Sequence, residues 1–237
     1  MWGEAFYFLG PDDANTVLVK VWGNPPGRKP LGMLFPAGVT PFDAESWAVT
    51  IEYEQDGYVS DEDASKIDYG ELLDQMKRVT KEESECRVKE GYAPIELVGW
   101  ASEPYYDQRP HKLHWAKEIK FGEAKQNTLN YNIRALGRQG VLVLNYIADM
   151  SQKPEIDANL DAVMAMTQFN PGNTYDEFNP EIDKVAAYGV GALITGKLLA
   201  KTGFLAVLML FLKKGGVFIL AGLAALGKRL MGRNRDA

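Results

Sequence analysis

The chain has 237 residues, with 26 basic and 32 acidic side chains and a formal net charge of −6. Its 11% aromatic and 24% charged residues are typical of a folded protein and exclude a disordered one. A single cysteine, Cys86, excludes an intrachain disulfide and a cysteine-based zinc site. The negative charge argues against nucleic acid as a partner, because that partner needs a basic face.

The charge is distributed unevenly along the chain. Residues 185–237 hold eight basic residues and one acidic residue, which leaves 18 basic and 31 acidic residues in 1–184. The chain is therefore an acidic body of formal charge −13 followed by an apolar tail of +7. Apolar segments flanked by cations are typical of membranes. We expect a soluble acidic α+β domain over residues 1–184 and a C-terminal membrane anchor over residues 185–237.

The first half of the body predicts three strands and two helices. The strands are expected at residues 6–9, 31–35 and 47–53, and the last of them alternates apolar and polar side chains with the period of a half-buried strand. A short helix is expected at residues 14–21. A longer helix at residues 69–89 has Leu72, Leu73, Met76 and Val79 at helical spacing, and the cluster at residues 60–63 precedes it as a helix start.

The second half of the body predicts four strand-like runs and one helix. The runs at residues 95–101 and 112–121 flank a loop at 104–110, and those at 128–136 and 141–148 flank a hairpin turn at 137–140. The helix is expected at residues 156–166. The fold class is therefore α+β, with an antiparallel sheet of about six strands covered by two or three helices.

The tail contains two uncharged stretches, residues 203–212 and 215–227, on either side of Lys213 and Lys214. One helix over both rises about 37 Å, enough to cross a hydrocarbon core of roughly 30 Å. Each lysine costs roughly 2.5–3.5 kcal/mol on insertion, whereas each Leu, Ile, Phe or Val recovers about 0.3–0.6 kcal/mol. The free energy of inserting a single crossing helix is therefore near zero. A shallow helical hairpin, a bundle with partner chains and a buried soluble helix pair are the alternatives. The side chains expected to contact lipid are Phe204, Leu208, Phe211, Phe218, Ile219 and Leu223.

Residues 228–235, near the end of the tail, hold four cations and no acidic residue: Lys228, Arg229, Arg233 and Arg235. The positive-inside rule therefore places the C-terminus in the cytoplasm. A single crossing then puts the acidic body outside the cytoplasm, whereas a hairpin keeps it inside. The first residues have neither the charged start nor the long apolar core of a signal peptide.

Polar side chains of two segments form a candidate binding face. Asn130, Asn132 and Arg134 share one face of a predicted strand, which suits a polar groove for sugar or peptide. The alternative is a structural polar network that ties this hairpin to residues 100–107. The complete candidate face consists of Trp100, Tyr106, Asp107, His111, Asn130, Asn132, Arg134 and Arg138.

The sequence predicts no catalytic residue, metal site or cofactor. His111 and His114 lie three apart on a strand-like run and point to opposite faces, so we expect a loop histidine that orders a turn. The acidic residues at 61–63 lack the alternating ligands of a calcium loop. No serine stands in a nucleophile-elbow context.

Several separate motifs resemble one bacterial family. They are residues 57–64, Gly99-Trp100 with Pro104, Tyr106-Asp107, His111, Leu113 and Trp115-Ala116, then 130–132, 136–138 with Gly140, and 183–186 with Tyr188-Gly189. Together they are similar to the uncharacterised membrane-anchored proteins of the domain of unknown function family 2167. The resemblance implies an extracytoplasmic domain anchored in the bacterial inner membrane, and it supplies no catalytic residues.

Two hypotheses for function follow. The first is a non-enzymatic, membrane-anchored envelope protein that binds a protein partner, associates with itself or scaffolds an assembly, with membrane lipid as a further partner. The second is a binder or enzyme acting on envelope glycans through Trp100, Tyr106, Asp107, Asn130 and Arg134, because aromatic and amide groups suit sugar faces and hydroxyls.

Overall fold

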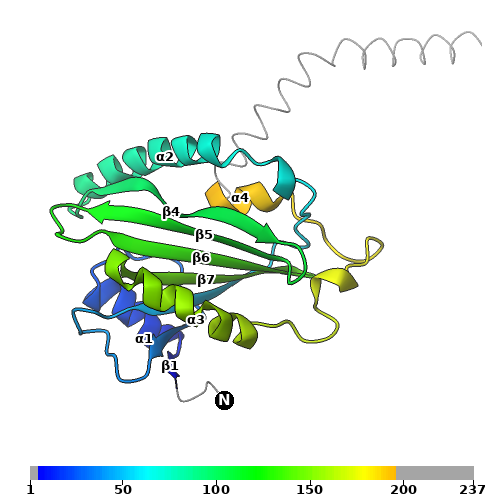
Figure 1. Ribbon diagram of the computed structural model, residues 1–237, viewed down its shortest axis with the longest axis horizontal. Coiled ribbons are helices and arrows are strands. Elements are labelled where there is room, and N and C mark those ends of the chain that lie inside the picture. The colour runs from blue at the N-terminus through cyan, green and yellow to red at the C-terminus, as the bar shows by residue number, and fades with distance from the viewer. Residues whose placement is uncertain (1–4, 196–237) are drawn as a thin grey trace, which may run out of the picture. The chain divides into compact units, whose positions relative to one another are not determined.

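The computed structural model describes residues 5–195, which contain one antiparallel sheet of seven strands in the order β1-β2-β3-β7-β6-β5-β4 (Figure 1). The strands are β1 (Phe6–Leu9), β2 (Gly32–Pro36), β3 (Ala48–Glu54), β4 (Ile95–Asp107), β5 (Lys112–Phe121), β6 (Thr128–Gly137) and β7 (Gly140–Asp149). The helices are α1 (Pro11–Thr16), α2 (Tyr69–Lys89), α3 (Lys153–Met166) and α4 (Val190–Thr195). Shorter helical turns are the π-helical η1 (Val17–Val21) and the 3₁₀ turns η2 (Ala64–Lys66), η3 (Met150–Gln152) and η4 (Tyr175–Glu177).

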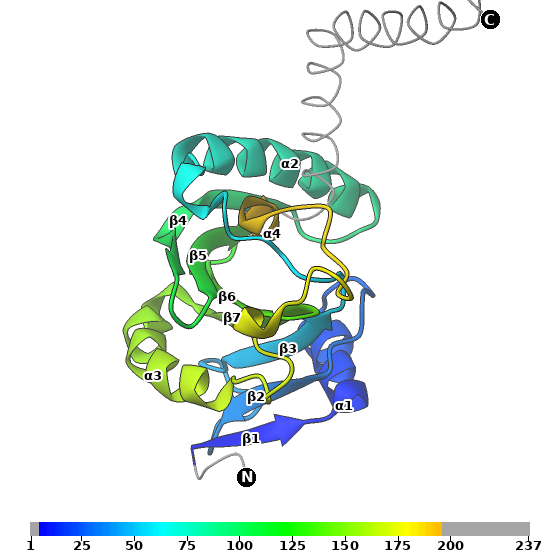
Figure 2. The same cartoon turned by 90° about the vertical axis from the view of Figure 1, so that its right-hand side faces the viewer.

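The sheet curves around α4, as Figure 2 shows, so its two faces differ. We call the face that carries α1, α2 and α4 the inner face, and the face that carries α3 the outer face. Side chains alternate between them along each strand because the pleat has a period of two residues. The register fixes which residues share a row: Lys117, Asn130, Ile147 and Ala48 face each other across four strands.

The outer face holds the larger part of the apolar core. Leu129 and Ile133 of β6 and Leu144 of β7 pack with Ile156 and Val163 of α3, and all five are fully buried. Burial of each such side chain contributes about 1.5–3 kcal/mol to folding. This cluster fixes α3 against the central strands.

The inner face has two separate apolar clusters. One lies toward β4, where Leu113, Trp115 and Val143 pack with Met76 of α2 and Leu193 of α4. The other lies toward β1, where Ala14 and Val17 pack on Met33, Phe35 and Ala48. The middle of this face, between the clusters, is polar, and the candidate site lies there.

The predicted α+β class and antiparallel sheet are confirmed, with seven strands where about six were expected. The helix at residues 69–89 is confirmed as α2. Its N-cap is Asp68, whose Oδ1 accepts from the backbone N–H groups of Gly70 and Glu71, so the cluster at residues 60–63 does not start this helix. The loop expected at residues 104–110 is shorter, because β4 continues to Asp107. The pairing of β4 with β5 is irregular between Ser102 and Tyr105. Pro104 is tolerated there because it cannot donate a ladder hydrogen bond and the regular ladder is interrupted at this point.

The compact unit ends at Ile194. The boundary expected after residue 184 falls before α4, whose Val190, Leu193 and Ile194 are buried in the inner-face cluster. The predicted lipid-facing residues and the cationic flank lie outside the described residues. Within 5–195, no helix combines the length and the apolar character needed to cross a membrane.

Candidate functional site

The eight residues of the predicted binding face separate into different places in the fold. Asn130, Asn132 and Arg134 lie in the polar middle of the inner face, as their alternation predicted. Trp100 packs beneath α2, and its indole N–H donates to the backbone oxygen of Tyr69 at 3.2 Å. Tyr106, Asp107 and His111 lie at the end of the β4–β5 hairpin, and Arg138 lies in the β6–β7 turn.

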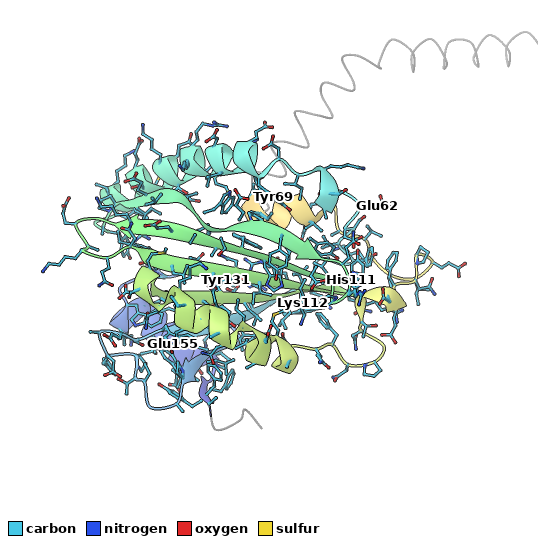
Figure 3. The ribbon with its side chains drawn as sticks, in the orientation of Figure 1. Glu62, Tyr69, His111, Lys112, Tyr131 and Glu155 are labelled. Atoms are coloured by element: carbon cyan, nitrogen blue, oxygen red, sulfur yellow. The ribbon has the colours of Figure 1, made fainter. Side chains whose placement is uncertain are left out.

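His111 orders the end of the β4–β5 hairpin, beside η4 (Figure 3). Its Nδ1 lies 3.0 Å from the Tyr106 hydroxyl and its Nε2 lies 3.1 Å from Asp176 Oδ1. The ring stacks on Tyr175 at 4.1 Å, and its backbone has a φ of 50°, which is uncommon for a residue other than glycine. Tyr106 donates to Asp61 at 2.8 Å, and burial followed by this hydrogen bond raises the Tyr106 pKa. These contacts hold η4 against the hairpin.

A second set of contacts fastens the segment from 183 to 191 to the segment from 56 to 63. The backbones of Tyr58 and Lys184 pair at 2.8 Å, and Asp63 accepts from the N–H groups of Val190 and Gly191 at the start of α4. Two of the motifs that carry the family resemblance, residues 57–64 and 183–189, therefore lie against each other. Their shared role in this fold is to bind the C-terminal part of the domain to its core.

Arg138 belongs to the same junction. Its Nε donates to Asp183 Oδ2 at 2.7 Å, and Nη1 donates to the backbone oxygen of Gly172 at 3.2 Å. The predicted turn at residues 137–140 is confirmed by the pairing of Gly137 with Gly140. Arg138 therefore projects from a two-residue hairpin turn onto the C-terminal segment.

The polar middle of the inner face is a continuous set of side chains from four strands, which we call the polar row. The register brings its members together on β3, β5, β6 and β7. It consists of Thr50, Lys117, Asn130, Asn132, Arg134 and Asn145.

Hydrogen bonds link most of the polar row. Asn132 donates to Asn130 Oδ1 at 3.1 Å, and Arg134 Nη1 donates to Asn145 Oδ1 at 3.0 Å. Asn145 in turn donates to the hydroxyl of Thr50 at 3.4 Å. The Arg134 guanidinium also lies over the Trp115 ring, 4.8 Å from its centroid, in a cation–π contact. The row is therefore a fixed polar surface.

The polar row contains two cations, Lys117 and Arg134. Over the described part of the chain, neither Lys117 nor Arg134 forms a salt bridge. Burial, followed by repulsion from Arg134, lowers the Lys117 pKa to about 8. Burial also lowers the Arg134 pKa to about 10. Both side chains keep some exposure to water. Both side chains are half-buried on the concave inner face of the sheet, and we call this part of the face the recess.

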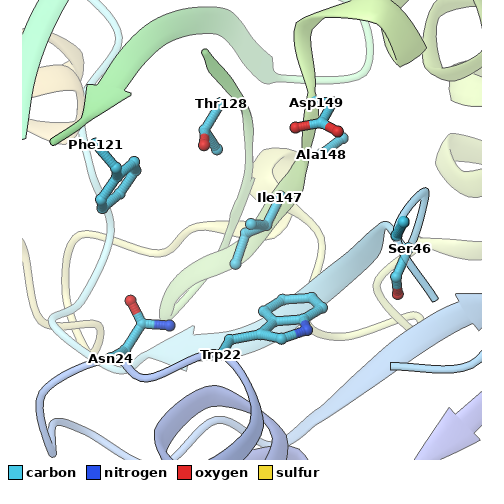
Figure 4. Close-up of a pocket in the computed structure, with 9 residues that line it drawn as sticks. Trp22, Asn24, Ser46, Phe121, Thr128, Ile147, Ala148 and Asp149 are labelled. Atoms are coloured by element: carbon cyan, nitrogen blue, oxygen red, sulfur yellow. The ribbon is translucent and has the colours of Figure 1, made fainter. Parts of the chain in front are cut away.

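A cavity of about 340 Å³ lies where β6 begins and β7 ends (Figure 4). Its lining consists of Trp22, Asn24, Ala44, Ser46, Phe121, Thr128, Ile147, Ala148 and Asp149. Ile147 pairs with Asn130, and Thr128 lies two residues before Asn130 on β6. Two residues span roughly 7 Å along a strand, so the cavity lining comes within about 7 Å, along β6, of the level of Lys117 and Asn130, which do not themselves line it.

Sequence reasoning missed three members of the polar row: Thr50, Lys117 and Asn145. Asn145 carried a signal, because it is the one amide in the apolar run from 141 to 148. Lys117 carried none, since Glu118 and Lys120 follow it closely and it resembles one of several ordinary surface charges. Its place opposite Asn130 depends on the pairing of β5 with β6.

The two histidines lie apart. His114 stacks on Tyr105 at the outer face, whereas His111 faces Asp176 at the end of the hairpin. In the described ranges, no group of three or more His, Cys, Asp or Glu side chains could hold a metal ion.

The chain belongs to the family of proteins of unknown function DUF2167, whose pattern it matches over residues 2–224. This confirms the resemblance found in the sequence motifs. No curated protein matches the chain. The solution structure of cyanobacterial PsbP (CyanoP) from Synechocystis sp. PCC 6803 is similar, with 12% sequence identity and a TM-score of 0.35. The likeness covers 68% of this chain and 80% of that one.

Proposed function

We propose that the chain is a non-enzymatic binding domain that receives a small polar ligand on the polar row of its inner face. The observation that carries the proposal is that Lys117 and Arg134, half-buried in the recess at the middle of the sheet, form no ion pair with any described residue. The proposal places part of the binding face predicted from the sequence, Asn130, Asn132 and Arg134, at the site.

The energetic cost of this recess supports a binding role. Charges removed from water without a counter-charge destabilise a fold, and apolar residues of similar size would pack there at lower cost. The corresponding positions on the outer face are apolar and buried. Proteins keep such costly groups mainly where binding or catalysis requires them. The polar row has amides, a hydroxyl and two cations, which suit recognition better than proton transfer.

The hairpin residues Tyr106 and His111 and the turn residue Arg138 have a structural role in this proposal. Their side chains are engaged with Asp61, Asp176 and Asp183. The glycan hypothesis is therefore narrowed to the inner face. A partner protein could deliver or receive the ligand there, which keeps the scaffolding hypothesis compatible with the proposal.

We further propose that residues 203–227 hold the domain at a membrane, as the hydropathy and cationic flank of the sequence suggest. Carbonate extraction of membranes from expressing cells tests this point. Retention of the full chain in the pellet supports the tether, and complete release argues against it.

A thermal-shift screen of small polar molecules tests the binding function. The full chain is compared with Arg134→Met and with Arg109→Met, an exposed arginine of the β4–β5 turn that serves as the matched control. We expect at least one neutral, anionic or zwitterionic molecule to stabilise the wild type and the control but not Arg134→Met, since binding to the native state raises its stability. The proposal would be wrong if every molecule shifted the melting temperature of all three chains equally, or if no molecule shifted it.

A further inference from the structure

We infer that the ligand is a small oxyanion-bearing sugar, with its anionic group between Lys117 and Arg134 and its ring in the nearby cavity. This inference rests on the proposed function, because it names the ligand class of the same face. The candidate ligands have in common a carboxylate or phosphate group attached to a sugar ring.

The donors left open on the two cations point to an anion. Arg134 Nη1 is bonded to the backbone oxygen of Ile133 and to Asn145, and Nη2 makes one long bond of 3.5 Å to Asn132. Its Nε–H and the second Nη2–H have no hydrogen-bond acceptor among residues 5–195. The ammonium group of Lys117 likewise has no hydrogen-bond acceptor in that part of the chain. An oxyanion accepts such hydrogen bonds well, since charge assistance about doubles their strength.

The charges around the recess also favour an anionic ligand. Lys117 and Arg134 repel each other, while Glu83 attracts Lys117, and Glu54 and Glu52 attract Arg134. An anion between the two cations would turn this repulsion into two attractions. The acidic surface of the domain would keep weakly held anions away, so that only a ligand with further contacts gains from the site.

The cavity supplies those further contacts and suits a sugar ring. Trp22 and Phe121 present aromatic rings at its wall (Figure 4), and the indole N–H of Trp22 is already donated to the backbone oxygen of Pro41. Asn24 donates its amide N–H to the backbone oxygen of Leu18, which leaves its Oδ1 as an acceptor. The hydroxyl of Ser46 is buried without a hydrogen-bond partner among the described residues. Aromatic faces combined with hydroxyl and amide groups match the two-sided chemistry of a sugar.

The register connects the two halves of the site. Phe121 and Lys117 lie on the same face of β5, four residues apart, and Ile147 of the cavity pairs with Asn130 of the polar row. A volume of about 340 Å³ is at the small end of ligand sites and fits one ring with its substituents. The site therefore has a cationic end and a ring-sized end.

The test is calorimetric titration of the full chain with D-glucuronate, D-glucose 6-phosphate, D-glucose and inorganic phosphate. We expect both charged sugars to bind at least about tenfold more tightly than glucose, because each adds charge-assisted hydrogen bonds to the same ring. Phosphate without a ring should bind more weakly than glucose 6-phosphate. If only one charged sugar binds, it identifies the anion as carboxylate or phosphate.

The variants separate the two ends of the site. Lys117→Met should abolish the advantage of the charged sugars over glucose, and Lys120→Met, which removes an exposed lysine of the same strand, should preserve it. Asn24→Ala should weaken all three sugars by a similar factor. The inference is overturned if charged and neutral sugars bind with equal affinity, or if no probe binds. It is also overturned if Lys117→Met still binds the charged sugars more tightly than glucose by the same factor as the wild type. A neutral ligand whose binding requires Arg134 but not Lys117 overturns it while leaving the proposed function standing.

Discussion

Lys117 lies in an environment unlike that of an ordinary surface lysine. Burial and the charge of Arg134 lower its pKa from 10.5 to about 8, so its charge destabilises the fold at neutral pH. Lys117→Met keeps the aliphatic stem and removes the charge. We expect the variant to be more stable than the wild type at pH 7 by about 1–2 kcal/mol, allowing for partial exposure to water. Urea unfolding at pH 7 measures this difference. A loss of stability would show that the ammonium group is paired after all.

The same residue gives a dependence on alkaline pH. Between about 8 and 10.5 the folded chain has released the Lys117 proton and the unfolded chain still holds it. Stability therefore rises with pH in this window. The wild type should approach the Lys117→Met variant between pH 7.5 and about 9.5, below the range in which tyrosines ionise. A constant gap between the two unfolding curves would contradict the lowered pKa.

His114 gives a dependence on acidic pH. It is 5% exposed, and burial followed by the charge of Lys112 lowers its pKa from 6.5 to about 4. Between these values the unfolded chain binds a proton that the folded chain does not, so stability falls as the pH falls from 6.5 to 4. The loss should reach up to about 3 kcal/mol. His114→Phe keeps a ring against Tyr105 and should lack this part of the acid loss. Parallel stability curves for the two proteins would refute it.

At the scale of elements, Asp63 determines whether α4 forms. Its carboxylate accepts from Val190 N–H at 2.9 Å and from Gly191 N–H at 3.2 Å. Asp63→Ala should cost about 1–2 kcal/mol, as for the loss of a helix cap. Glu62→Ala, a change of the exposed neighbouring acid, is the matched control and should cost little. Chemical denaturation measures both, and equal effects would mean that the cap does not stabilise α4.

The elements themselves were largely predictable, because each depends on local patterns. Alternation gave the strands, helical spacing gave α2, and paired glycines gave the β6–β7 turn. Strand continuity through Pro104 was not predictable, since it depends on irregular pairing with β5. The role of residues 61–63 could not be predicted from the sequence either. A cluster of acids before a helix resembles a cap, but Asp63 caps a helix more than a hundred residues later in the chain.

The candidate site shows the same limit. Asn130, Asn132 and Arg134 were identified because they alternate on one strand. Their grouping with Tyr106, His111 and Arg138 did not follow from any local pattern, and the fold places those three at the junction with the C-terminal segment. Lys117 and Asn145 joined the row only through the pairing of β5, β6 and β7.

At the scale of the whole molecule, the end of the domain is set by packing and not by charge. The composition changes at residue 185, but Val190, Leu193 and Ile194 are 0%, 6% and 4% exposed in the inner-face cluster. Each contributes about 1.5–3 kcal/mol through burial, against a total stability of about 5–15 kcal/mol for a typical domain. A chain ending at Thr195 should therefore unfold cooperatively, whereas one ending at Lys184 should be unfolded or aggregate. Similar melting temperatures by circular dichroism would contradict this.

The charge distribution also acts at this scale. The acidic body surrounds a recess that holds two cations, so the local potential opposes that of the surface. Such a contrast favours a ligand that brings both an anion and a ring over a simple salt ion. Moderate salt should therefore weaken the charged part of binding less than it would at an exposed site, because buried interactions are less screened.

Binding of an anion at Lys117 is tested by the pKa of its amine, followed by NMR in the full chain labelled with carbon-13 at the lysine Cε positions. The spectrum of Lys117→Met assigns the resonance. We expect a pKa of about 8 in the free protein and a rise toward 10.5 when D-glucuronate or D-glucose 6-phosphate is added, because a bound anion favours the charged amine. A value near 10.5 in the free protein, or a lowered value that neither ligand changes, would contradict this expectation.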